Sequence, residues 1–366
     1  MHYEGRFVVE THAHISTLYR PKGKPEGFWS GLPSAPEDGE VEVYDNSALT
    51  LYDMERYGVD MVLLKPSVTG TTNESQAKMV ADHPGKFASY CCDQKLKIKC
   101  ARGETVWTLQ AAADEVEAAL KTGQFIGIGE FVPRNWDRRK IYGFEERLNE
   151  YRVFAELARD YDVVLDFHDF TWEYEWDAWS LLNRISMEFP KLPIVICHGG
   201  QSIGHYALGD RNIRRACEIA GSAIAGGRNL YLETGTWPAE WYKLPLENSN
   251  IGPTQILWGS DYGHVPQYII AQPGSVPSSY STAMKRWPAI PAYQTDWWGW
   301  GFHQIHKVRD YVTQDEINLI LGGNAARLYK LKVPYDRMFM CGRPDVWGIG
   351  WEESMPFLPP NQIINP

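Results

Sequence analysis

The sequence predicts an α/β fold, a TIM-type (β/α)8 barrel with a long insertion after strand eight and an irregular C-terminal tail. Short apolar runs alternate along the chain with longer amphipathic stretches. The short runs are apolar throughout, which is typical of strands buried on both faces of a parallel sheet. Eight strand–helix units in about 330 residues fit a closed barrel better than an open doubly wound sheet. The chain of 366 residues, 44% of them hydrophobic, is large enough for such a core.

The elements follow in order along the chain. The predicted strands are 7–10, 59–65, 86–92, 125–131, 163–168, 193–198, 229–234 and 255–261. Between them lie helical stretches such as 45–57, 107–122, 144–161, 175–189 and 208–225. No GxGxxG motif opens a helix after the first strand and no P-loop is present, so we expect no nucleotide cofactor.

Two regions interrupt the alternation within a barrel domain of residues 1–332. Residues 262–312 form the insertion, with WPAIPAYQTDWWGWG at its centre, and residues 333–366 form a tail rich in Pro and Trp. Aromatic segments of this kind are costly to leave in water. We expect them to cap the mouth of the barrel or to form a subunit interface, in a homo-oligomer or in a hetero-oligomer with a paralogue.

Composition limits the partners and the location. The formal net charge of -10 argues against a nucleic-acid partner. No apolar run is long enough to span a bilayer, and the start of the sequence lacks the pattern of a signal peptide, so no membrane partner and a cytoplasmic location are expected. Six cysteines without a CxxC pair favour buried thiols, Cys91 and Cys92 among them, over disulfides.

Metal-ligating side chains stand at the ends of the predicted strands. In the first strand, FVVETHAHI, the two histidines are two residues apart and therefore point to the same face. The strand-end residues are His12, His14, Glu130, His168, His198 and Asp261. Parallel barrel strands all end on one face, where such groups are costly to bury unless a cation neutralises them. Imidazole and carboxylate together predict a divalent metal site.

The same stretches resemble a known family. VVETHAHI, VVLDFH, VICHGG, ILWGSDYGH and GGNAARLYKL look like the amidohydrolase superfamily, and more narrowly like its aminocarboxymuconate semialdehyde decarboxylase-like members. The resemblance covers residues 8–331. It implies that His12, His14, His168 and Asp261 are metal ligands and that His198 is a ligand or an acid/base. It implies a structural role for Asn324.

Two residues depart from that family's pattern. Glu10 stands where the family often has Asp, which moves a supporting group rather than a ligand. Glu130 has no usual counterpart in the single-metal decarboxylases and resembles the carboxylate that bridges two metals in dinuclear members. With Glu130 as bridge, one ion would take His12, His14 and Asp261, and the other His168 and His198. In the alternative, Glu130 caps a loop or pairs with Arg134.

We expect one or two divalent transition metal ions (Zn, Mn or Fe), with Asp261 and His198 as the catalytic residues. Asp261 would take a proton from water and pass it to a leaving group, which suits hydrolysis of a small-molecule substrate that is polar and carries a carboxylate. Non-oxidative decarboxylation at a single ion fits the same residues. Two alternatives stay open: a dinuclear iron monooxygenase, and a low-activity scaffold subunit that partners an active paralogue.

Further polar residues near strand ends are candidates for substrate binding. They are Lys65, Arg134, His205 and His264, with Asp169 and Thr234 beside other strand ends. Lys65 or Arg134 would pair with a substrate carboxylate. His303 and His306, three residues apart on an expected helix in the insertion, could reach the mouth of the barrel but are expected to lie at the surface.

Overall fold

The structure is a computed structural model of the chain. It describes residues 6–14, 17–21, 41–45, 47–66, 72–101, 103–130, 143–168, 175–200, 210–222, 229–235, 237–261 and 297–333.

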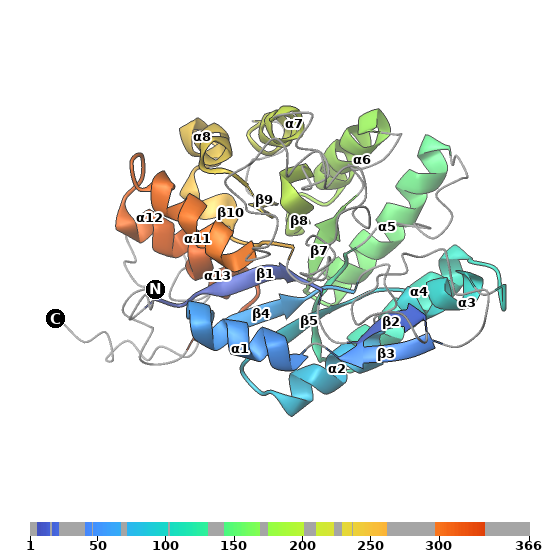
Figure 1. Ribbon diagram of the computed structural model, residues 1–366. Helices are drawn as coiled ribbons and strands as arrows, with labels where there is room; N and C mark the ends of the chain where they lie inside the picture. The colour runs from blue at the N-terminus through green and yellow to red at the C-terminus, as the bar shows by residue number, and fades with distance from the viewer. Residues whose placement is uncertain are drawn as a thin grey trace, which may run out of the picture.

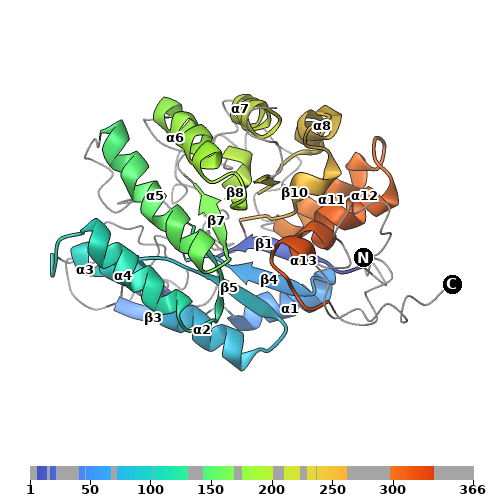
Figure 2. The ribbon, with the colours of Figure 1, turned by 180° about the vertical axis from the view of Figure 1, so that it is seen from behind.

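Eight parallel strands form a nearly closed barrel, as predicted (Figures 1 and 2). In spatial order they are β1 (Val9–Ala13), β4 (Met61–Leu64), β5 (Phe87–Cys91), β6 (Phe125–Ile128), β7 (Val164–Phe167), β8 (Ile194–Ile196), β9 (Leu230–Glu233) and β10 (Ile256–Leu257). Each overlaps one predicted strand. β1 begins and ends later than expected, so that His12 lies inside it. Thr11 joins the first and last strands, because its backbone N–H and its hydroxyl both donate to the carbonyl of Trp258, at 3.1 and 2.9 Å.

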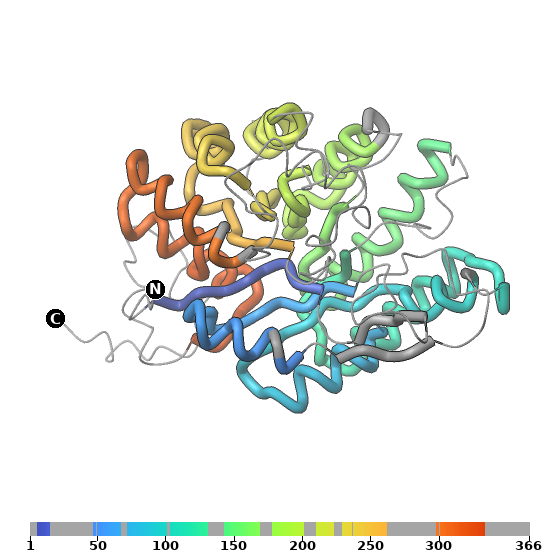
Figure 3. Tube along the Cα trace, in the orientation of Figure 1, coloured from blue at the N-terminus to red at the C-terminus, as the bar shows by residue number. Residues whose placement is uncertain are grey.

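Helices surround the barrel and follow its strands in chain order (Figure 3). They are α1 (Ser47–Tyr57), α2 (Asn73–Asp82), α3 (Gln94–Ala101), α4 (Leu109–Leu120), α5 (Phe144–Asp160), α6 (Glu175–Glu188), α7 (Arg211–Ala220), α8 (Ala239–Glu247), α11 (Trp297–Val308), α12 (Gln314–Asn318) and α13 (Asn324–Leu328). The five predicted helices correspond to α1, α4, α5, α6 and α7. Side-chain caps start several others; Thr72, for example, accepts from the backbone N–H of Ser75 ahead of α2.

The C-terminal part of the predicted insertion is a helix of the outer ring. α11 lies beside α8 in both views (Figures 1 and 2), and its Trp298 is fully buried. The ring of Phe302 stacks on Trp258 at 4.7 Å between centroids and on Tyr57 of α1 at 6.2 Å. Residues 262–296 lie outside the described part of the chain, as does the tail from residue 334 onward.

Side chains fill the barrel and the layer between sheet and helices. Val9, Leu63, Tyr90 and Leu257 pack inside the barrel, next to residues of the last helix and Val333. A short antiparallel pair that the sequence did not predict, β2 (Thr17–Pro21) and β3 (Val41–Asp45), follows β1. Among the described residues, no helix is both long and apolar enough to cross a bilayer.

Candidate metal centre

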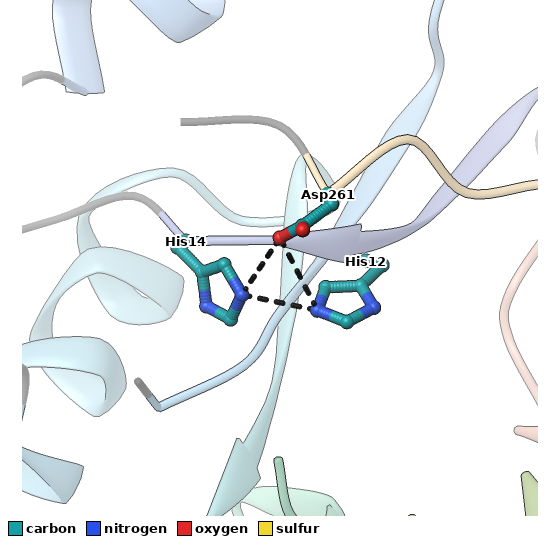
Figure 4. Close-up of side chains that lie close together, drawn as sticks. All are labelled: His12, His14 and Asp261. Atoms are coloured by element: carbon teal, nitrogen blue, oxygen red, sulfur yellow. Dashed lines mark hydrogen bonds and ion pairs between the residues drawn. The ribbon is translucent and has the colours of Figure 1, made fainter. Parts of the chain in front are cut away.

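His12, His14 and Asp261 converge at the carboxyl ends of the first and last strands (Figure 4). The Nε2 atoms of the two histidines lie 3.0 Å apart. Asp261 Oδ1 lies 3.1 Å from His14 Nε2 and 3.7 Å from His12 Nε2. One ligand atom of each residue therefore faces the same small volume, as the His-x-His spacing on a strand predicts.

Glu130, His168 and His198 adjoin this group. Glu130 Oε2 lies 3.2 Å from His14 Nε2, while its other oxygen, Oε1, lies 2.5 Å from His168 Nε2. The His198 ring stacks on His12 at 4.6 Å between centroids and meets His168 edge-on at 4.9 Å. His198 Nε2 lies 3.6 Å from Asp261 Oδ2 and is buried without a hydrogen-bond partner among the described residues. The six predicted ligands therefore form one cluster.

Two of these residues have left-handed backbone conformations. His198 has φ 53° and Asp261 has φ 59°, values uncommon for residues with a side chain and typical of functional sites. Trp237 supports the turn at His198, because its indole Nε1 donates to the His198 carbonyl at 2.8 Å. A Cβ on the next residue, Gly199, would lie 2.2 Å from the Trp237 ring, so only glycine fits there.

Glu233, at the end of β9, contacts two of the predicted ligands. Its Oε2 lies 2.5 Å from His12 Nδ1 and accepts from the backbone N–H of His198 at 3.2 Å. Its Oε1 accepts from the backbone N–H of Gly235 at 2.5 Å. A carboxylate on the far nitrogen of a ligating imidazole fixes the ring and leaves Nε2 facing the metal.

Glu10 connects the two ends of the barrel sheet. Its buried carboxylate accepts from the backbone N–H of His12 at 2.8 Å and of Ser260 at 2.9 Å. It also accepts from the Ser260 hydroxyl and from the indole of Trp298 in α11, at 2.5 and 2.7 Å. Glu10 thus supports residues next to the ligands rather than acting as one, as predicted for this position.

The electrostatics of the cluster fit a cation. Burial and the charge of Lys65 lower the pKa of His12, but the charge of Glu233 and the hydrogen bond of Glu130 outweigh them and raise the pKa to about 10. Burial is likewise outweighed at His14, where Glu130 and Asp261 raise the pKa to about 9. Histidines that hold protons so tightly indicate an excess of negative charge, which a metal ion at the same place would neutralise.

His198 differs from its neighbours. Burial lowers its pKa to about 3, and the positive charges of His12 and His168 act in the same direction. Its imidazole is therefore neutral near pH 7, which leaves one ring nitrogen with a lone pair for a ligand or a proton.

The other predicted site residues lie elsewhere or outside the described residues. Lys65 is fully buried, and its ammonium group lies 2.7 Å from Asp166 Oδ2 in the barrel interior. The Thr234 hydroxyl donates to the Gly259 carbonyl at 3.0 Å, between the ends of β9 and β10. His303 and His306 are exposed on α11, as expected. The candidates outside the described residues are Arg134, Asp169, His205 and His264.

The sequence analysis missed Glu233 and Asp166. Both are fully buried carboxylates within apolar strands, in the stretches NLYLET and VVLDFH. A charged residue in an otherwise apolar strand is costly without a partner, and this was the available signal.

Comparisons with known proteins agree with this picture. A family model described as amidohydrolase matches residues 9–331. A probable 2-pyrone-4,6-dicarboxylic acid hydrolase of Acinetobacter baumannii is similar in structure, with TM-score 0.51, 12% identity and coverage of 88% of this chain and 99% of that one. A 4-oxalomesaconate hydratase of Rhodopseudomonas palustris has TM-score 0.51, 17% identity and coverage of 88% and 96%. A mutant organophosphorus hydrolase of Deinococcus radiodurans has TM-score 0.51, 13% identity and coverage of 90% and 95%. At these identities the structural likeness shows the fold alone. No curated protein matched the chain.

Proposed function

We propose, since the chain belongs to the amidohydrolase family, that it uses a dinuclear centre to hydrolyse or non-oxidatively decarboxylate a small carboxylate-bearing compound. The family itself points to a metal-dependent, hydrolase-type enzyme. The two ions, the type of reaction and the class of substrate are the parts that we propose.

The position of Glu130 is the observation that carries the dinuclear proposal. Its two oxygens face different imidazoles, one towards His14 and the other towards His168. A carboxylate that only capped a loop would have no reason to lie between two ligand groups. The charge of His168, followed by that of His14, outweighs burial and holds the pKa of Glu130 well below its usual range, so the side chain is anionic.

The balance of charge supports a second ion. Four carboxylates contact either a predicted ligand imidazole or the ammonium group of Lys65. They are Glu130, Asp166, Glu233 and Asp261. Together they carry four negative charges, against the single positive charge of Lys65. One divalent ion would leave this group negative, whereas two would leave a single positive charge. A hydroxide or a substrate carboxylate would neutralise that charge, and this is the reason for proposing an anionic substrate.

Bound metal would supply a Lewis acid and would lower the pKa of water in the centre. Asp261 would take the proton of that water; the proposal is supported by its Oδ1 facing His12 and His14 while its Oδ2 faces His198. His198 would either help to hold the second ion or, if it is not a ligand, accept and return a proton at Nε2, since its imidazole is neutral near pH 7. Glu233 would keep the His12 ring in one orientation throughout.

The test is metal stoichiometry in a pair of variants. Plasma mass spectrometry of purified protein should find about two transition-metal ions per chain in the wild type, and about one in Glu130→Gln, because the amide is a poor bridge. Glu150→Gln, on α5, is the matched control and should keep the wild-type content. About one ion per chain in both the wild type and Glu130→Gln would refute the dinuclear centre and favour decarboxylation at a single ion, whereas two ions in both would refute only the bridging role of Glu130.

The identity of the metal separates hydrolysis from oxygenation. Zinc or manganese, without any optical response to oxygen, would support the proposed chemistry. Two iron ions per chain with oxygen consumption tied to a substrate would instead support a dinuclear iron monooxygenase. Equal activity of metal-free and reconstituted protein across a substrate panel would support the scaffold subunit.

A further inference from the structure

Lys65 is a cation enclosed in the barrel beneath the metal centre. Its side chain is 0% exposed, and its Nζ lies 2.7 Å from Asp166 Oδ2, 3.5 Å from Cys197 Sγ and 3.9 Å from Glu233 Oε2. It also lies 5.2 Å from the centre of the Tyr90 ring. Apart from Lys65, no described residue donates a hydrogen bond to the Asp166 carboxylate, so this ion pair is the main compensation for its burial.

Each polar contact of Lys65 is made either with a predicted metal ligand or with a residue that contacts or neighbours one. Its backbone carbonyl lies 3.0 Å from His14 Nδ1. Through its ammonium group it reaches Glu233, which holds His12 Nδ1. Asp166 on β7 precedes His168, just past the end of that strand, by two residues, and Cys197 directly precedes His198. Three strand ends that carry predicted ligands, those of β1, β7 and β8, therefore meet at one lysine, together with the end of β9, which carries Glu233.

We propose that Lys65 is a positioning residue of the metal centre, and that with Asp166 it sets the affinity of the centre for its ions. This inference rests on the proposed metal function. Asp166 engages the ammonium at 2.7 Å and leaves it 3.9 Å from Glu233, so that Glu233 keeps its shorter contact with His12. The pair thereby prevents the lysine from drawing Glu233 away from the ligand.

This role differs from binding a substrate carboxylate. A buried lysine that is already paired with Asp166 would have to break an ion pair in the barrel interior to reach a substrate. Such a step leaves a buried carboxylate without its counter-ion, which is strongly unfavourable. Lys65 is instead oriented towards the groups that support the ligands.

The two charges of the pair have opposite expected effects on metal binding. In Lys65→Met the cation is lost while Glu233 and Asp166 stay, so the centre should bind zinc about tenfold more tightly or better. In Asp166→Asn the ammonium loses its partner and turns to Glu233, so zinc binding should weaken about 10- to 100-fold. The double variant Lys65→Met/Asp166→Asn restores the balance and should bind within about threefold of the wild type.

The measurement is competition between metal-free protein and a chromogenic chelator for zinc, with the unfolding midpoint of each variant in urea. The matched control is the buried pair of Lys97 and Asp93, 2.8 Å apart and almost fully enclosed. Lys97→Met should lower the unfolding midpoint and leave the zinc affinity within about twofold of the wild type.

The outcomes separate this inference from the proposed function. If the wild type binds neither zinc, manganese nor iron, the metal function itself is refuted. If it binds zinc but the single variants shift the affinity in the same direction, or not at all, only the role of Lys65 and Asp166 is refuted. Should Lys65→Met fail to fold, the weakened binding of Asp166→Asn and its recovery in the double variant decide the question.

Discussion

At the scale of single residues, the carboxylate of Glu233 connects β1 to the turn that follows β8. It contacts the ring of His12 and the backbone of His198, two residues whose own rings stack on each other. A ligand pair held by one shared acceptor moves as a unit. Changes that displace the His198 turn are therefore expected to reach His12 as well.

The turn at His198 provides a test of this packing. Gly199→Ala places a methyl group 2.2 Å from the Trp237 ring and also strains a backbone with φ 59°. Gly123→Ala has a similar φ of 68° but no atom within 4 Å of the new Cβ. We expect Gly123→Ala to cost about 1–2 kcal/mol of unfolding free energy, and Gly199→Ala about 1–3 kcal/mol more.

Urea denaturation of both glycine variants measures the difference directly. Equal losses would mean that Trp237 moves aside at no cost. In that case the hydrogen bond from the Trp237 indole to the His198 carbonyl would not stabilise the turn measurably.

Part of the site could be predicted from residue type and spacing alone. His12, His14 and Asp261 follow from strand periodicity and from the rule that parallel strands end on one face. The roles of Glu233 and Asp166 could not be predicted, because their partners come from other strands and only the folded barrel brings them together. The sequence marked Lys65 as polar at a strand end, but its direction into the barrel depends on Asp166.

At the scale of elements, α5 and α6 are joined by a forked ion pair. Arg152 donates from Nε and Nη2 to the two oxygens of Glu188, at 2.6 and 2.7 Å. The hydrogen bond from Arg152 is the largest influence, and with Arg184 it lowers the pKa of Glu188 from 4.5 to about 2. The folded protein therefore releases this proton more readily than the unfolded chain does.

The sign of this shift predicts a pH dependence. The pair contributes its full stability above about pH 4.5, and the contribution disappears as the pH falls towards 2. Glu188→Gln should therefore be less stable than the wild type at pH 7, with the gap narrowing below pH 4.5. Chemical denaturation at pH 7, 4 and 3 checks this, and a gap that stays constant with pH would contradict the assignment.

The strands were more predictable than the helices. Apolar runs locate all eight barrel strands, because strands buried on both faces need no other signal. α11 lies in the predicted insertion, where a helix was expected only around His303 and His306; its first turn, WWGWG, contains two glycines that disfavour a helix. The helix forms because Trp298 donates to buried Glu10 and Phe302 stacks on Trp258, contacts that are absent from local sequence.

At the scale of the whole molecule, the described chain leaves the barrel on the side away from the metal centre. Val333 packs in the same cluster as Phe7, which precedes β1, and Met61, which begins β4. These residues lie at the amino ends of the strands, whereas the ligands lie at the carboxyl ends. Of the two roles predicted for residues 333–366, we therefore favour a subunit interface over a cap on the mouth.

A chain that ends at Val333 tests this role of the tail. We expect light scattering to show a smaller assembly or aggregation, since removing an interface exposes apolar surface. Zinc affinity should remain that of the full chain, because the ligands lie at the other end of the barrel. An unchanged assembly mass would rule out the interface.

The contact between Glu10 and Ser260 joins residues 250 positions apart. Because the first strand is synthesised early and the eighth late, His12 and His14 are made long before Asp261, the carboxylate that lies beside them in the folded barrel. Closing so long a segment makes barrel closure a slow event compared with local helix formation. Until then, a growing chain displays two adjacent imidazoles without the acidic partner that completes the first ligand group. We therefore expect an ion to be bound only after the last barrel strand has joined the sheet, and the yield of loaded protein to depend on the metal present at that point.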